Sequence, residues 1–212
     1  MPAYELAECE RHLARARDLA ATAASLSAQV TGAVDFSDMY RAAFVQGVSA
    51  LDTFVHAEVR VRMLNTFELG LPSTQAFERF RLSMASVRAA IASSNSASTK
   101  VNFLEAEIRE QHSYLSFQQP NKIAEAVRLV SDVKLWDELA KYLGIDGTKG
   151  QTGAQVLRRR LTLIIDRRNT IVHESDIDPT PPGDHVYPIS RMMADDALDV
   201  IDSVVHAIAV TI

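Results

Sequence analysis

Three features are scarce in this 212-residue chain: cysteine, glycine together with proline, and long apolar runs. Cys9 is the only cysteine, so the chain can form neither an internal disulfide nor a multi-cysteine metal site. The 8 glycines and 7 prolines are too few for a fibrous or low-complexity protein. No apolar stretch approaches the roughly 20 residues that span a bilayer, and no basic region followed by an apolar run opens the chain. We therefore expect a soluble, cytoplasmic protein without membrane contact.

Positive charge is also scarce over the whole chain, whose formal net charge is −5. This balance argues against a protein that coats nucleic acid non-specifically, because such binding depends on many lysine and arginine contacts to phosphate. One window, residues 149–173, departs from the average with six basic residues and one acid, so it carries +5 and the remainder −10. The basic residues are Lys149, Arg158, Arg159, Arg160, Arg167 and Arg168. If the protein binds an anionic ligand, this window is where we expect it.

Helix-forming sequence is abundant. Hydrophobic residues make up 47% of the chain and charged residues 23%, and apolar residues recur at helical spacing, as at Phe44, Val48, Leu51 and Val55. No alternating strand pattern of useful length appears. We predict an all-α fold, a compact bundle of about six to seven helices in a single domain over residues 1–212. The expected helices are Tyr4–Val30, Ser37–Glu68, Thr74–Ser93, Thr99–Phe117, Asn121–Leu143 with a bend near Ser131, Ala154–Glu174 and Ser190–Val210, and a rigid connection spans Pro179–Pro188.

The helix predicted over residues 154–174 has a charge where its apolar stripe calls for a hydrophobic side chain. The stripe steps through positions 157, 161, 164, 168 and 171, and position 168 is an arginine. Desolvating a guanidinium is costly unless the group is paired. Arg168 should therefore face an acid, a subunit interface or an anionic ligand.

Further polar side chains follow on the same helix. Asn169 and His173 are four residues apart and are neighbours on the helix surface, and Asp166, a supporting residue, precedes them on nearly the same side. Arg168 and His173 are offset by about 140° at 100° per residue. One straight helix cannot point both side chains at a single atom, although both can reach an extended phosphodiester. Two such helices related by a two-fold axis can share a cleft, so we expect a homodimer with a composite site.

An arginine, an asparagine and a histidine in one cleft suit phosphodiester cleavage without a metal or another cofactor. The guanidinium fork of Arg168 matches paired phosphate oxygens. An imidazole changes charge near neutrality, so His173 can act as base on a ribose 2′-hydroxyl or as acid to the leaving oxygen. Asn169 would orient the histidine or the substrate. The residues expected to contact the rest of the RNA are Arg158, Arg159 and Arg167.

The run Arg168-Asn169 followed by three residues and His173 resembles the Arg-x(4 to 6)-His signature of the HEPN superfamily (higher eukaryotes and prokaryotes nucleotide-binding). The resemblance implies an all-α bundle, usually dimeric, and in many members a metal-independent endoribonuclease that leaves 2′,3′-cyclic phosphate ends. Such proteins are common among toxins and phage-defence effectors, so an antitoxin or defence-system partner protein is implied as well. Residues 48–56 are similar to the second-helix segment of the RiboL-PSP-HEPN branch, in which Asp52 would help to position Arg168 or the base.

Each candidate residue also has a purely structural interpretation. His173 can be a helix-terminal histidine that favours the C-terminal dipole and binds nothing. Arg168 can be paired with Asp52 or another acid at an interface. The run Arg158-Arg159-Arg160 can be a solvated face, and the acidic cluster around Glu107 is interpreted as one. At the level of function, the alternative to a ribonuclease is a non-catalytic HEPN-like helical module that binds a partner protein or a nucleotide.

Overall fold

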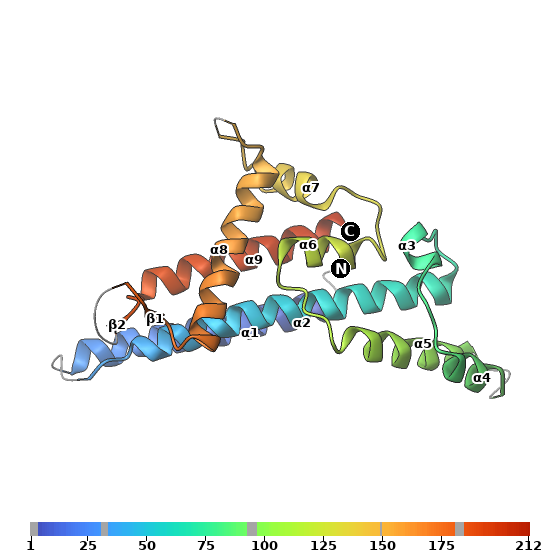
Figure 1. The fold of residues 1–212 in the computed structure, drawn as a ribbon, viewed down its shortest axis with the longest axis horizontal. Helices are drawn as coiled ribbons and strands as arrows, with labels where there is room; N and C mark the ends of the chain where they lie inside the picture. The colour runs from blue at the N-terminus through green and yellow to red at the C-terminus, as the bar shows by residue number, and fades with distance from the viewer. Residues whose placement is uncertain (1–3, 31–33, 93–96, 149, 181–184) are drawn as a thin grey trace.

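The computed structural model of the protein describes residues 4–30, 34–92, 97–148, 150–180 and 185–212. Helices dominate this part of the chain, which confirms the all-α prediction (Figure 1). They are α1 (Tyr4–Gln29), α2 (Ser37–Leu69), α3 (Gln75–Glu78), α4 (Met84–Ala92), α5 (Ala97–His112), α6 (Pro120–Val127), α7 (Leu135–Tyr142), α8 (Gly153–His173) and α9 (Arg191–Thr211). Two short strands, β1 (Ile177–Asp178) and β2 (His185–Val186), pair antiparallel between α8 and α9. No described helix is both long and apolar enough to cross a membrane.

Side-chain and glycine signals set several helix ends close to their predicted positions. A capping box begins α8: the Thr152 hydroxyl accepts from the Gln155 N–H (3.3 Å), and Gln155 Oε1 accepts from the Thr152 N–H (2.8 Å). The hydroxyl of Ser190 caps α9 by accepting from the Met193 N–H (3.3 Å). Gly70 ends α2 with a φ of 61°, a left-handed conformation that glycine adopts without steric cost.

The helix predicted over residues 74–93 is divided into α3 and α4. The Ser83 hydroxyl accepts a hydrogen bond from the Ser86 N–H (3.1 Å) and so caps a new helix inside the predicted one. Glu107 of α5 fastens this cap, because its carboxylate accepts from the Ser83 N–H (3.2 Å) and hydroxyl (3.0 Å). Glu107 is only 5% exposed, so the interpretation of this acid as part of a solvated face is wrong.

Two further predicted helices are shorter than expected. The one predicted over Asn121–Leu143 consists of α6 and α7, separated at the expected bend, where Ser131 Oγ accepts a hydrogen bond from the Val133 N–H (3.4 Å). Such local side-chain bonds compete with the helical ladder. The one predicted over Thr99–Phe117 ends at His112.

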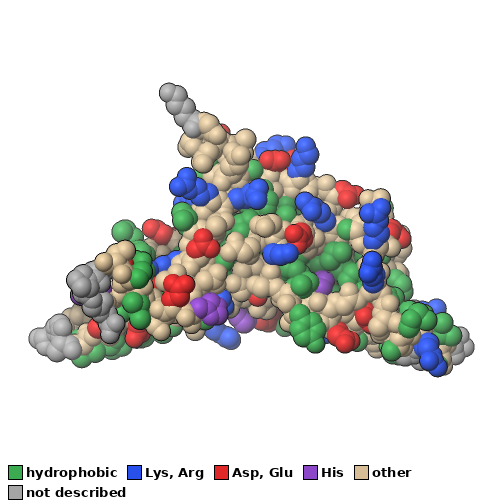
Figure 2. All heavy atoms as spheres, in the orientation of Figure 1, with side chains coloured by type: hydrophobic (Ala, Val, Ile, Leu, Met, Phe, Trp, Pro, Cys, Tyr) green, Lys and Arg blue, Asp and Glu red, His purple; other side chains and the backbone are tan. Residues whose placement is uncertain are grey.

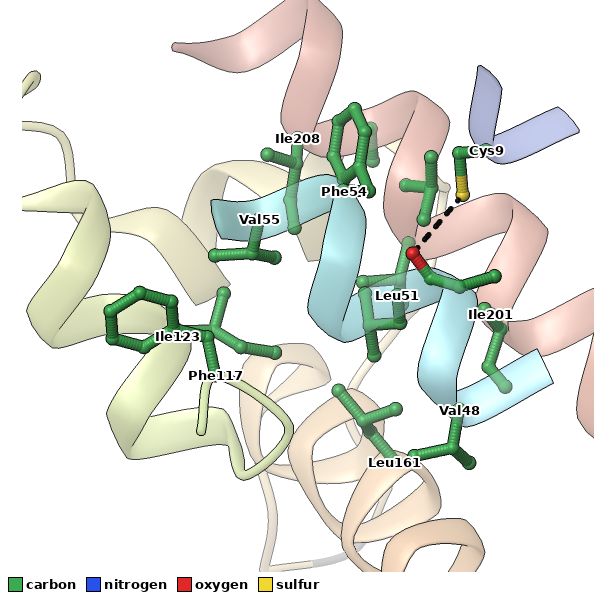
Figure 3. Close-up of a cluster of buried hydrophobic side chains, with 14 of the residues drawn as sticks. Cys9, Val48, Leu51, Phe54, Val55, Phe117, Ile123, Leu161, Ile201 and Ile208 are labelled. Atoms are coloured by element: carbon green, nitrogen blue, oxygen red, sulfur yellow. Dashed lines mark hydrogen bonds between the residues drawn. The ribbon is translucent and has the colours of Figure 1, made fainter. Parts of the chain in front are cut away.

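The bundle is organised around α2, which packs along α1 and α9 and is crossed by α8 (Figure 1). Gly47 lies where α2 meets α9: a Cβ atom there would be 2.4 Å from Leu198 Cδ2, so the missing side chain permits the close approach. The predicted apolar stripe of α2 is buried at Phe44, Val48, Leu51 and Val55, and α9 buries Ala197, Ile201, Val204 and Ile208. One hydrophobic cluster joins these helices to Leu161 of α8 and Ile123 of α6 (Figure 3).

A buried histidine lies at the contact between α5 and α2. His112 is 5% exposed, and its ring meets those of Phe117, Phe80 and His56 with centroid separations of 5.3, 6.2 and 6.1 Å. Its Nδ1 has no hydrogen-bond partner among the described residues. Burial, together with the positive charges that His56 and Arg60 can carry nearby, lowers the pKa of His112 to about 4.

We predict that His112 makes the fold less stable in mild acid. Its pKa in the folded state lies below the value of 6.5 expected for the unfolded chain, so the unfolded chain binds more protons between these two values. The free energy of unfolding should therefore fall as the pH drops from about 6.5 to about 4, by up to about 3 kcal/mol. Urea denaturation of the wild type and of His112→Leu at pH 7.5 to 4 measures this loss. A loss of equal size in both proteins would show that another group is responsible.

Candidate functional site

The C-terminal half of α8 carries the residues that the sequence singles out. The buried stripe of this helix consists of Ala154, Leu157, Leu161 and Ile165. Arg168 follows Ile165 at the next helical step and is half-buried. The sequence placed Ile164 on the stripe, but the structure buries Ile165 and leaves Ile164 half-buried. Arg168 nevertheless continues the buried face.

Arg168 has few partners inside the protein. Its Nη1 donates to Asn169 Oδ1 at 3.1 Å, which assigns Asn169 to the arginine and not to the imidazole. Its Nε is buried and has no hydrogen-bond partner, and no carboxylate among the described residues forms an ion pair with it. A half-buried guanidinium without a carboxylate is costly. Its remaining N–H groups suit a bound anion.

Arg167, the preceding residue, also has a buried Nε without a hydrogen-bond partner among the described residues, but unlike Arg168 it is paired with a carboxylate. Its Nη2 donates to Asp176 Oδ2 (2.8 Å) and to the backbone carbonyls of Tyr187 (3.3 Å) and Pro188 (3.2 Å). Its guanidinium carbon lies 5.0 Å from the centroid of the Tyr187 ring, within reach of a cation–π interaction. These internal partners give Arg167 a structural role, and the RNA contact that the sequence predicted for it stays a prediction.

Asp176 is the residue on which Arg167 depends, and sequence reasoning missed it. The residue is 0% exposed, and its Oδ2 accepts from Arg41 Nε (2.7 Å) and Arg167 Nη2 (2.8 Å). Ser175 and Asp176 have φ angles of 52° and 59°, a backbone conformation that costs a non-glycine residue roughly 1 kcal/mol or more. The two charge-assisted bonds offset this strain. The only signal in the sequence was that two acids, Glu174 and Asp176, follow the basic window.

His173 is the last residue of α8 and is exposed. Within the described part of the chain, no side chain forms a hydrogen bond or an ion pair with it. Asn169 lies one turn before His173 on the same side of the helix, and its side chain is hydrogen-bonded to Arg168. Asp166 is exposed, and its backbone carbonyl accepts from the Thr170 hydroxyl (3.2 Å). The helix is continuous here, so Arg168 and His173 keep their offset of about 140°.

Asp52 is engaged elsewhere. Its carboxylate accepts from the Phe117 N–H (2.6 Å) and from Gln118 Nε2 (3.3 Å), and His56 Nε2 lies 3.8 Å away. These contacts tie α2 to the connection between α5 and α6. Arg168 is not among the partners of Asp52 in the residues described, so no contact supports the expected positioning role of this acid.

The two other predicted RNA contacts, Arg158 and Arg159, are exposed on the first half of α8. Figure 2 shows lysine and arginine side chains over the part of the surface that α7 and α8 form, in the upper half of the view. Fifteen residues separate Arg158 from His173, which is about 22 Å along a helix at 1.5 Å per residue. Lys149, also in the basic window, lies outside the described residues.

No protein-family model, no curated protein and no solved structure matches this chain. The chemistry of the side chains themselves is therefore the guide to function. Among the residues described, no group of three or more His, Cys, Asp or Glu side chains is arranged to hold a metal ion.

We predict that replacing the two neighbouring arginines by methionine has unequal effects on stability. Arg167→Met leaves Asp176 with Arg41 as its one cationic partner among the described residues, so the free energy of unfolding should fall by about 2–4 kcal/mol. Arg168→Met removes a half-buried charge that has no carboxylate partner, so the free energy should change by less than about 1 kcal/mol or rise. Urea denaturation at pH 7 measures both values. Equal losses would mean that Arg168 is a structural residue too.

Proposed function

We propose that the protein is a metal-independent endoribonuclease that cleaves RNA at a site formed by Arg168, Asn169 and His173. The observation that carries this proposal is the contrast between two adjacent arginines. Arg167 is committed to Asp176, whereas the half-buried Arg168 keeps N–H groups without an internal partner, and an exposed histidine follows five residues later. An RNA phosphate supplies the negative charge and the paired oxygens that a guanidinium binds best.

The reaction assigns one role to each side chain. Arg168 binds the scissile phosphate and neutralises the charge that develops on its oxygens. Asn169 holds Arg168 through their 3.1 Å hydrogen bond. His173 accepts the proton of the ribose 2′-hydroxyl, whose oxygen attacks phosphorus. The bond from phosphorus to the 5′ oxygen breaks, that oxygen takes a proton from solvent, and the products are a 2′,3′-cyclic phosphate and a 5′-hydroxyl.

The rest of the RNA would follow α8. Arg158 and Arg159 are exposed on the same helix as the proposed site, so a strand laid along α8 meets both before it reaches His173. Phosphate contacts of this kind position the nucleic acid without reading its bases. A protein with a net charge of −5 attracts RNA through such a local window and not through its overall charge.

The offset of Arg168 and His173 supports a homodimer in which one copy supplies the arginine and the other the histidine. The groove between α8 and α9 offers a surface for a second copy, since Leu163 is 60% and Met193 41% exposed there. Arg160 and Asp196 line the same groove with opposite charges. A patch that contains both signs can pair with itself across a two-fold axis. A role as a toxin or phage-defence effector, with an antitoxin or other partner protein, remains a prediction from the resemblance.

The first experiment measures cleavage of a fluorescently labelled RNA in EDTA. The wild type should cleave it, and His173→Ala and Arg168→Ala should each lower the rate by about 10² to 10⁴-fold, the size of an acid–base or oxyanion contribution. His12→Ala is the matched control, because His12 is a partly exposed histidine on α1 whose side chain is 44% accessible. It should cleave at the wild-type rate.

Equal cleavage by the wild type and both site variants would refute the assignment of the site. RNA binding by the wild type without any cleavage, measured by fluorescence anisotropy, would favour the non-catalytic module instead. Mass spectrometry of the fragments checks the chemistry, since ends other than 2′,3′-cyclic phosphate would contradict attack by the 2′-hydroxyl.

A mixing experiment tests the composite site. In a mixed dimer of Arg168→Ala and His173→Ala chains, one of the two sites retains both side chains. Mixing the inactive variants should therefore restore about one quarter of the wild-type rate, because about half of the dimers are mixed. Adding Leu163→Asp to both chains should abolish the recovery by breaking the dimer, as light scattering would show. A wild type that is strictly monomeric and still cleaves RNA would exclude the shared site.

A further inference from the structure

Three charged residues form a cluster at the C-terminal end of α8, next to the proposed site. The Asp176 cluster consists of Arg41 of α2, Arg167 of α8 and Asp176 in the turn that follows α8. Arg41 and Asp176 are 135 residues apart in the chain, yet Arg41 Nε lies 2.7 Å from Asp176 Oδ2. The side chains of these residues are 11%, 20% and 1% exposed, in the order Arg41, Arg167 and Asp176. The cluster is therefore a packed junction and not a surface ion pair.

The cluster fastens three segments of the chain to one another. The Asp176 N–H donates to the Thr170 carbonyl of α8 (3.1 Å), and the Asp176 carbonyl accepts from the Tyr187 N–H that follows β2 (2.8 Å). Arg41 Nη2 donates to the Tyr187 carbonyl (2.7 Å). The end of α8, the segment after β2 and the start of α2 thus meet at one residue, Asp176, through its carboxylate and its backbone.

His173 lies inside the loop that this junction closes. The Thr170 carbonyl precedes His173 by three residues, and it accepts from the Glu174 N–H (3.0 Å) and the Asp176 N–H (3.1 Å), which follow His173. These two hydrogen bonds therefore close the turn that contains His173. The imidazole is exposed and has no partner of its own among the described residues. Its position relative to the rest of the bundle therefore comes from the backbone that the Asp176 cluster holds.

We propose that Asp176 is the positioning residue of the candidate site. It anchors the turn of α8 that carries His173, and by pairing with Arg167 it leaves Arg168 as the arginine of the tandem that is available to phosphate. Asp176 contacts no reacting atom in this scheme and acts through Arg41 and Arg167. The expected effect of Asp176 on the cleavage rate rests on the proposed ribonuclease function, whereas its expected effect on the end of α8 does not.

The experiment compares Asp176→Asn, which preserves shape and removes charge, with the wild type. Misplacing a general base by about 1 Å can cost about 100-fold in rate, so kcat should fall by about that factor while KM changes less than about 3-fold. Amide hydrogen exchange supplies a readout that does not depend on cleavage. The amides of residues 174 and 176 should lose protection by about 10-fold or more, because the last turn of α8 opens locally.

Ile208→Val is the matched control, since Ile208 is buried in α9 and its truncation lowers the melting temperature without touching the cluster. It should leave kcat and the protection of residues 174 and 176 at wild-type values. Arg41→Gln and Arg41→Lys form a second pair that keeps the Arg167–Asp176 bond, and Lys should restore much of what Gln loses. This pair decides the question if Asp176→Asn does not fold.

Each result decides one claim. Wild-type kcat and wild-type exchange in Asp176→Asn or Arg41→Gln would overturn the positioning role. A wild type that cleaves no RNA would refute the proposed function alone. In that case the exchange data still decide the inference: lost protection at residues 174 and 176 supports the anchoring role of Asp176, and unchanged protection overturns it.

Discussion

The carboxylate of Asp176, shared by Arg41 and Arg167, is the interaction on which the geometry of the candidate site depends. A fully buried carboxylate is costly unless its charge is paired. Two guanidinium groups pair the charge at one oxygen, Oδ2, at 2.7 and 2.8 Å, whereas Oδ1 is buried and has no hydrogen-bond partner among the described residues. Arg41 distributes its own charge further, to the hydroxyl of Ser37 (2.7 Å) and the carboxylate of Asp38 (3.2 Å). The junction therefore joins helices that are far apart in the sequence and holds two residues in a left-handed turn.

This junction explains how two adjacent arginines come to differ. Neighbouring residues of a helix point about 100° apart, so they cannot share an environment. Arg167 points toward Asp176 and Tyr187, whereas Arg168 continues the buried stripe and bonds only to Asn169 among the residues described. A sequence signature with one arginine and one histidine does not by itself identify which of the two adjacent arginines, Arg167 or Arg168, binds phosphate. The internal pairing of Arg167 leaves Arg168 for that role.

Most of the helical architecture was predictable because apolar residues recur at helical spacing and because caps are local. Thr152, Ser190 and Gly70 act within four residues of their own positions, and the corresponding helix ends were placed well. One clear error came from a contact between distant segments. Glu107 fastens the cap at Ser83 across 24 residues, and this contact makes a break where propensity alone favours one longer helix.

The order of residues alone places Arg168, Asn169 and His173 on one late helix and puts an arginine on its buried face, because helical periodicity depends on nothing else. The tertiary structure decided which side chains are paired and with what. Whether an arginine is paired depends on which acid the fold brings to it, and Asp176 reaches Arg41 across 135 residues. The same reason separated Asp52 from the site: its partners are Phe117 and Gln118, on a connection that periodicity does not place.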